Sequence, residues 1–130
     1  MAVFLDLGVE KDVVDDDRHT PLHIAAAGSR AAITRLLLDS GAHIGAAGGE
    51  GRAPLHSAAA DLDTTVVELL LDKGADKEAR DNEGWTPLHI TSPIAGALLI
   101  KRGADEHAKN KEGHEPALTH QSQATQNYQK

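Results

Sequence analysis

A four-residue motif returns along the chain at a fixed spacing, and this spacing restricts the fold more than any other feature. The motif reads Thr-Pro-Leu-His at residues 20–23, Ala-Pro-Leu-His at residues 53–56 and Thr-Pro-Leu-His at residues 86–89. Each copy begins 33 residues after the previous one, and the same step separates Gly8, Gly41 and Gly74. This period predicts a repeat architecture, in which each unit covers the apolar face of its neighbour.

Each unit combines two expected helices with a polar connection. Pro21 suits the first turn of a helix, because its missing N–H has no intrahelical partner there, and Thr20 before it suits the N-cap. The second helix of this unit is expected at about residues 31–40, with Gly41 ending it. Ala53 replaces the capping threonine in the next unit, which is expected to cost about 1 kcal/mol of local stability.

The motif and its period, together with Leu-Leu-Leu at residues 69–71 and Gly-Ala-Asp at residues 74–76, resemble the ankyrin repeat family. The resemblance covers roughly residues 3–118, which is most of the chain. It implies an all-α fold: an ankyrin-type solenoid of stacked antiparallel helix pairs with projecting β-hairpin loops.

The repeat boundaries divide the chain into an ankyrin repeat domain at residues 1–118 and a polar tail at residues 119–130, which is expected to be disordered. The domain comprises a half unit, two full units, a shortened unit and the start of another, at residues 1–19, 20–52, 53–85, 86–114 and from 115. The shortened unit lacks four residues. We expect its first helix from Pro87 to about Thr91 and its second from about Ala95 to Arg102.

Composition narrows the classes of function. A formal net charge of −7 argues against general nucleic-acid binding, because neutralising phosphates requires clustered Lys and Arg. The chain has no cysteine, which excludes disulfides and thiol chemistry. It has no apolar run long enough to cross a membrane, so no membrane partner is expected. It also lacks a secretory signal pattern and an Asn-x-Ser/Thr acceptor. We therefore expect an intracellular protein of the cytoplasm, with the nucleus as an alternative.

Eight histidines raise the question of a metal site. His23, His56 and His89 occur once per unit, but stacked helices lie about 8–10 Å apart, whereas zinc ligands converge within about 2.0–2.3 Å of one ion. The resemblance implies a structural role instead, in which each ring hydrogen-bonds the backbone and ties hairpin to helix.

Two other loops lack the pattern of a ligand-binding site. The consecutive acids at residues 15–17 lack the alternation of a calcium loop, and the glycine-rich residues 45–51 lack the lysine of a phosphate-binding loop.

No sequence typical of catalytic serines, zinc proteases or nucleotide-binding loops occurs, so we predict no enzyme, no cofactor and no metal. The resemblance implies a protein-interaction scaffold that binds a protein partner on its hairpin tips and first helices. Carried over to this chain, the protein-binding positions are Asp16, Asp17, His19, Glu50, Arg52, Asn82, Glu83, Trp85, Lys111, Glu112 and His114. Two alternatives stay open: a structural spacer within a longer repeat array, and an accessory domain that presents substrates to an enzyme.

Trp85 is the only tryptophan and falls at a hairpin tip rather than on a helix stripe. One interpretation is a binding hot spot, since Trp and Arg are enriched among the residues that dominate binding energy. The other is a brace, with the ring packed on the neighbouring hairpin.

The half unit at residues 1–19 has no first helix, so its apolar side chains lack a cover on one side. These are Val3, Phe4, Leu5 and Leu7. We expect self-association through this uncapped half repeat.

Overall fold

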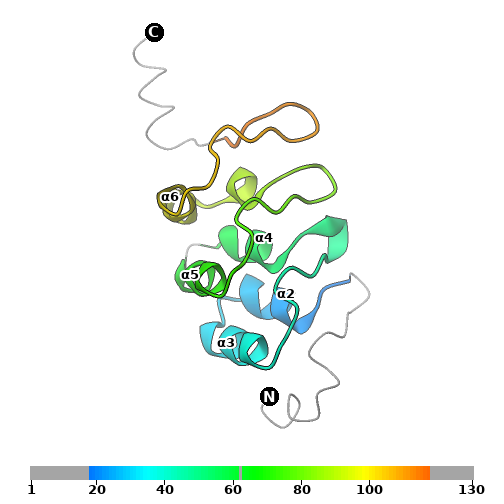
Figure 1. The fold of residues 1–130 in the computed structure, drawn as a ribbon, viewed down its shortest axis with the longest axis vertical. Coiled ribbons are helices and arrows are strands. Elements are labelled where there is room, and N and C mark those ends of the chain that lie inside the picture. Colours follow the sequence, from blue (N-terminus) through cyan, green and yellow to red (C-terminus); the bar gives the residue numbers. More distant parts are fainter. Residues whose placement is uncertain (1–17, 62, 118–130) are drawn as a thin grey trace.

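Three stacked units form the part of the chain that the computed structural model describes, residues 18–61 and 63–117 (Figure 1). In order, its helices are α2 (Pro21–Ala27), α3 (Ala31–Asp39), η1 (Gly49–Gly51), α4 (Pro54–Ala59), α5 (Thr65–Asp72), η2 (Pro87–Ile90) and α6 (Pro93–Lys101), where η marks a 3-10 helix. No strand occurs in these residues, which confirms the all-α prediction. No helix within them has the length and apolarity needed to cross a membrane.

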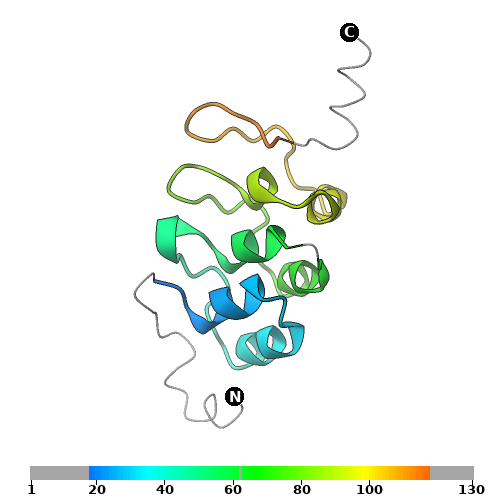
Figure 2. The same ribbon diagram turned by 180° about the vertical axis from the view of Figure 1, so that it is seen from behind.

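The helices lie in two layers, and loops project from one side. The first helices of the units, α2, α4 and η2, form the layer beside the loops, and α3, α5 and α6 form the layer behind them (Figure 1). Seen from behind, the three loops still extend on one common side, one per unit (Figure 2). We call these loops fingers 1, 2 and 3, and define them as residues 48–52, 81–85 and 110–114.

The first helices begin as the motif predicts, at a proline after a capping residue. The Thr20 hydroxyl accepts a hydrogen bond from the His23 backbone N–H at 3.3 Å, and the His23 ring Nδ1 accepts one from the Thr20 N–H at 3.2 Å. Ala53 has no side-chain oxygen, so only the ring contact remains there, from the Ala53 N–H to His56 Nδ1 at 3.0 Å. The α4 start therefore lacks half of the capping interaction.

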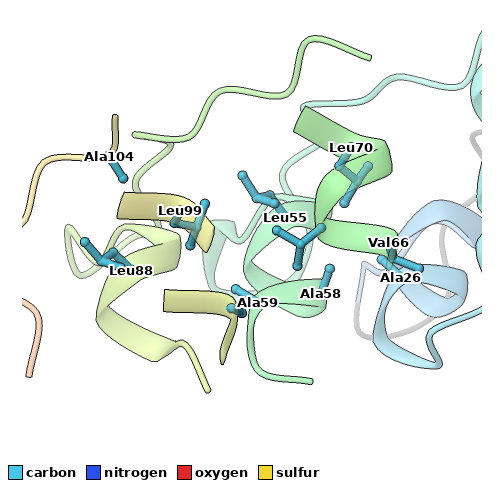
Figure 3. Packing of buried hydrophobic residues seen from close by; sticks show 11 residues of the cluster. Ala26, Leu55, Ala58, Ala59, Val66, Leu70, Leu88, Leu99 and Ala104 are labelled. Atoms are coloured by element: carbon cyan, nitrogen blue, oxygen red, sulfur yellow. The ribbon is translucent and has the colours of Figure 1, made fainter. Parts of the chain in front are cut away.

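Aliphatic residues form a core that runs through the units. One cluster joins helices of all three units and comprises Ala26, Leu55, Ala58, Ala59, Val66, Val67, Leu70, Leu88, Ala95, Leu99 and Ala104 (Figure 3). Alanines fill many of its positions, which lets neighbouring helices approach closely. A second cluster, Leu22, Ala25, Leu37 and Ala42, lies within the unit at residues 20–52.

The shortened unit differs from the prediction at both helices. Its first helix is the 3-10 turn η2, and α6 begins at Pro93 rather than at about Ala95. Pro93 starts a helix here because Ser92 caps it, with its hydroxyl accepting from the Ala95 N–H at 3.3 Å. The same hydroxyl donates to the Asp61 carbonyl at 2.8 Å, which ties the shortened turn to the preceding unit. A Cβ at Gly96 would lie 2.9 Å from the Thr91 hydroxyl oxygen, so the close turn requires glycine.

The fingers turn back on themselves like hairpins, but without strands. A backbone bond joins the first and last residues of each finger: Gly48 N–H to Arg52 O at 2.8 Å, Asp81 N–H to Trp85 O at 3.0 Å and Asn110 N–H to His114 O at 2.9 Å. A second bond closes each turn, from Gly51, Gly84 and Gly113 to the carbonyl of the first residue of the same finger. With only five residues each, the fingers are too short for a β-ladder.

Successive fingers also bond to each other. The N–H of Asn82 donates to the Glu50 carbonyl at 2.9 Å, and that of Lys111 to the Glu83 carbonyl at 3.0 Å. A Cβ at Gly84 would lie 2.9 Å from the Lys111 nitrogen, and Gly84 has φ 78°. Glycine thus permits both the turn and the contact between fingers.

Candidate protein-binding surface

The histidine of each motif links the first helix of its unit to the finger at the end of the same unit. Nε2 of His23, His56 and His89 lies 2.7, 2.7 and 2.9 Å from the carbonyl oxygens of Arg52, Trp85 and His114. On the other side of each ring, Nδ1 accepts a backbone N–H from Thr20, Ala53 and Thr86. Because Nδ1 is an acceptor, the ring proton resides on Nε2, which donates to the carbonyl. The structural role predicted for these histidines is confirmed.

The environment of His56 favours the neutral form of its ring. Burial lowers the pKa of His56 below its ordinary value of 6.5, although its hydrogen bond to the Trp85 carbonyl opposes the shift. The unfolded chain therefore binds a proton more readily than the folded one just below pH 6.5. This contribution to stability is full above pH 6.5 and declines as the pH falls toward the folded pKa.

Asp81 organises finger 2 from its base. Its Oδ1 accepts the backbone N–H groups of Glu83 and Trp85, both at 2.9 Å, and its Oδ2 accepts from Arg52 Nε at 3.2 Å. Asn110 does the same in finger 3, where its Oδ1 accepts from Glu112 and His114 at 2.9 and 3.0 Å. Neither residue was among the predicted positions. Each is the first residue of its finger.

The pKa of Asp81 reflects these bonds. Burial of the carboxyl group would raise its pKa, but the N–H of Trp85, the Arg52 side chain and the N–H of Glu83 together lower it below the ordinary value of 3.8. A lowered pKa means that the folded state gains stability when Asp81 is ionised. That gain is present above pH 3.8 and is lost as the pH falls through the folded pKa.

Arg52 and Trp85 both line a cavity between fingers 1 and 2, and Trp85 lies at the base of its finger rather than at the tip expected from the sequence. The cavity has a volume of about 180 Å³ and is lined by Glu50, Arg52, Asp81, Asn82, Glu83 and Trp85. Arg52 is anchored at its edge by Asp81 and lies 3.8 Å from the Glu50 carboxylate. Five of the predicted positions are thus brought together here.

Trp85 also borders a larger hollow on the side of finger 3. Its ring lies 5.9 Å from the His89 ring between centroids, and the residue is half-buried. The hollow, of about 710 Å³, is lined by Trp85, His89, Lys109, Asn110, Gly113, His114, Glu115, Pro116 and Ala117. The ring therefore contacts the first helix of the next unit and borders the hollow beside finger 3.

A third hollow, a groove, lies between the fingers and the first helices. It has a volume of about 470 Å³ and is lined by His19, Gly49, Glu50, Arg52, His56, Ser57, Ala60 and Ile90. Ser57 and Ile90 occupy the repeat position of Ile24, whose side chain is 56% exposed. This row was not among the predicted positions, although the isoleucine directly after the motif histidine in two units could have indicated it.

The remaining predicted positions are more dispersed. Lys111 and Glu112 are exposed in finger 3, beside His114. Asp16 and Asp17 lie outside the described residues, as do most of the half unit and the tail at residues 119–130. Within residues 18–61 and 63–117, no three His, Cys, Asp or Glu side chains are grouped so that they could hold a metal ion.

The two helix layers and the stacked fingers define a helical repeat protein. A family model described as ankyrin repeats (3 copies) matches residues 1–81 and also residues 42–110. The chain belongs to the ankyrin repeat family. Its repeats generally act as protein–protein interaction modules, and the family is typically non-catalytic. No curated protein matches the chain significantly.

Proposed function

We propose that this chain is a non-catalytic scaffold that binds a protein partner on the surface made by the fingers and the first helices. The observation that supports it most is the row formed by His19, Arg52, Trp85 and His114. These residues share one repeat position, and three of them are fixed through their carbonyls by motif histidines. Two of them, Arg52 and Trp85, are of the types that most often dominate binding energy.

This surface combines apolar, aromatic and charged groups without closing around a small molecule. The hollows along it are open grooves bordered by exposed residues of two or more segments. Such a surface suits a polypeptide, which can contact several layers at once. Binding would need little rearrangement, since the fingers are already joined by backbone bonds.

The test compares Trp85→Ala with Ile94→Ala on the affinity of a partner captured with the full chain. Ile94 is a matched control, because its side chain is apolar and 58% exposed but belongs to α6 in the other helix layer. We expect Trp85→Ala to weaken binding by about 2 kcal/mol or more and to leave the melting temperature almost unchanged.

A different pattern would contradict the proposal. If Trp85→Ala lowers the melting temperature by several degrees while the folded fraction binds normally, Trp85 is a brace. If Ile94→Ala weakens binding and Trp85→Ala does not, the partner uses the α3, α5 and α6 layer instead.

Two further expectations belong to the same proposal. Self-association would proceed through Val3, Phe4, Leu5 and Leu7, which lie outside the described residues. Sedimentation at high protein concentration tests it, and a monomer that Phe4→Glu leaves unchanged would exclude it.

An intracellular location is proposed on the lack of cysteine, and imaging of the tagged full chain tests it.

A further inference from the structure

Three parallel rows of side chains cross the proposed binding surface. Glu50, Glu83 and Glu112 share one position at the finger tips, and all three are exposed. The second row is Arg52, Trp85 and His114 at the finger bases. The third row, which we call the floor, is Ile24, Ser57 and Ile90 on the first helices, and Ser57 and Ile90 line the groove beside the fingers. A partner that runs along the stack would meet the same three positions in each layer.

The rows are held in register by contacts between layers. The backbone bonds from Asn82 to Glu50 and from Lys111 to Glu83 join the tips. The ion pair from Arg52 Nε to Asp81 Oδ2 at 3.2 Å joins the bases of fingers 1 and 2. The glutamates therefore recur at the spacing of the layers, which is about 8–10 Å for packed helices.

The finger tips are the acidic part of this face, whereas Arg80 and Lys109 add cations directly before the bases of fingers 2 and 3. Fingers 1 to 3 contain four acidic residues, Glu50, Asp81, Glu83 and Glu112, and two basic ones, Arg52 and Lys111. The Arg52 charge is offset locally by Asp81, whose side chain is only 2% exposed. The tips therefore present more carboxylates than cations to a partner.

We propose that the partner contributes an extended segment in which Lys or Arg recurs at about every third residue, with apolar side chains between. This inference rests on the proposed function. An extended chain in the polyproline II conformation advances about 3.1 Å per residue with three residues per turn, so one turn spans one layer and every third side chain points to the same side. Its cations would face the glutamate row, and its apolar side chains would lie on the floor between Ile24 and Ile90.

Both the shape and the charge of the surface favour such a segment. The first helices supply apolar contact, since Ile24 is 56% exposed and Ala60 and Ile90 line the groove. The glutamate row lies at its rim, as Glu50 lines both this groove and the cavity beside Trp85. An acidic segment would be repelled by the tips and by a chain of net charge −7.

The experiment selects peptides from an unbiased random 12-residue display library against the full chain. Affinities of the selected peptides are then measured for the wild-type chain, Glu83→Lys, Glu68→Lys and the triple variant E50K/E83K/E112K. Glu68 is a matched control, because it is an exposed glutamate on α5 in the other helix layer. Circular dichroism of each variant verifies that it is folded.

We expect selected peptides enriched in Lys and Arg at a spacing of about three residues. The triple variant should weaken their binding at least tenfold, Glu83→Lys should weaken it several-fold, and Glu68→Lys should not change it. Added salt should also weaken binding, because the charges are exposed.

Two outcomes would overturn the inference in different ways. If neutral or acidic peptides are selected and Trp85→Ala abolishes their binding, the surface binds partners but not basic ones, and the proposed function stands. If no finger or first-helix substitution affects any selected peptide, the proposed function fails as well.

Discussion

Replacing Asp81 gives the sharpest test of how a finger is held in shape. Asp81→Ala removes the acceptor for two backbone N–H groups and for Arg52 at once. Hydrogen bonds to a charged group contribute about 1.5–3 kcal/mol each, whereas the ion pair with the half-exposed Arg52 adds at most about 1 kcal/mol. Water can replace part of the lost contacts at the tip, so we expect a total loss of about 3 kcal/mol.

Asp81→Asn separates the two contributions. The amide oxygen of Asn110 already accepts both equivalent N–H groups in finger 3, so an amide at residue 81 should hold the turn. Only the charge pairing with Arg52 is lost, at about 1 kcal/mol.

Urea unfolding, followed by far-ultraviolet circular dichroism, measures both variants under identical conditions. Asn110→Ala is the control, and should cost about 1–2 kcal/mol because its acceptor is neutral. Equal losses for Asp81→Ala and Asp81→Asn would show that the ion pair dominates. A loss below about 1 kcal/mol for Asp81→Ala would refute the role assigned to the carboxylate.

Three more predictions concern the units themselves. Ala53→Thr should raise the free energy of unfolding by about 1 kcal/mol in urea titrations, because it restores the missing cap; a loss would mean that the hydroxyl does not fit. Hydrogen exchange should be faster at residues 98–100 than at residues 69–71, because α6 belongs to the shortened unit; equal protection would mean that the deletion is well accommodated. Stability should decline below pH 6.5 as His56 is protonated and again below pH 3.8 with Asp81; His56→Gln should remove part of the first decline.

Much of the fold could be predicted because its signals are local and repeated. Pro21 and Pro54 fix helix starts through their missing N–H groups, and the same residues recur in each unit. The histidine contacts followed from the family resemblance. The sequence alone does not show which carbonyl a ring contacts 29 residues further along.

The shortened unit was predicted less well, because a proline in a helical sequence is compatible with either the end or the start of a helix. Pro93 can end one helix or begin the next, and the choice depends on Ser92. The Ser92 hydroxyl bonds to Asp61, which lies 31 residues earlier in the chain. A contact at that distance in sequence leaves no local pattern.

The candidate surface was predicted in outline only. The candidate positions at the finger tips and bases came from the family resemblance, which assigns binding to the hairpin loops. Asp81, Asn110 and Ile24 were not among them, since a finger's internal bonds and the exposure of a helix position depend on how the layers stack.

The most direct test of the binding surface is an NMR titration of the isotope-labelled full chain with a selected peptide. The account predicts shift changes for the backbone amides of Ile24, Glu50, Glu83 and Trp85, on the first helices and fingers. Changes confined to α5 and α6, around Glu68 and Ile94, would contradict it.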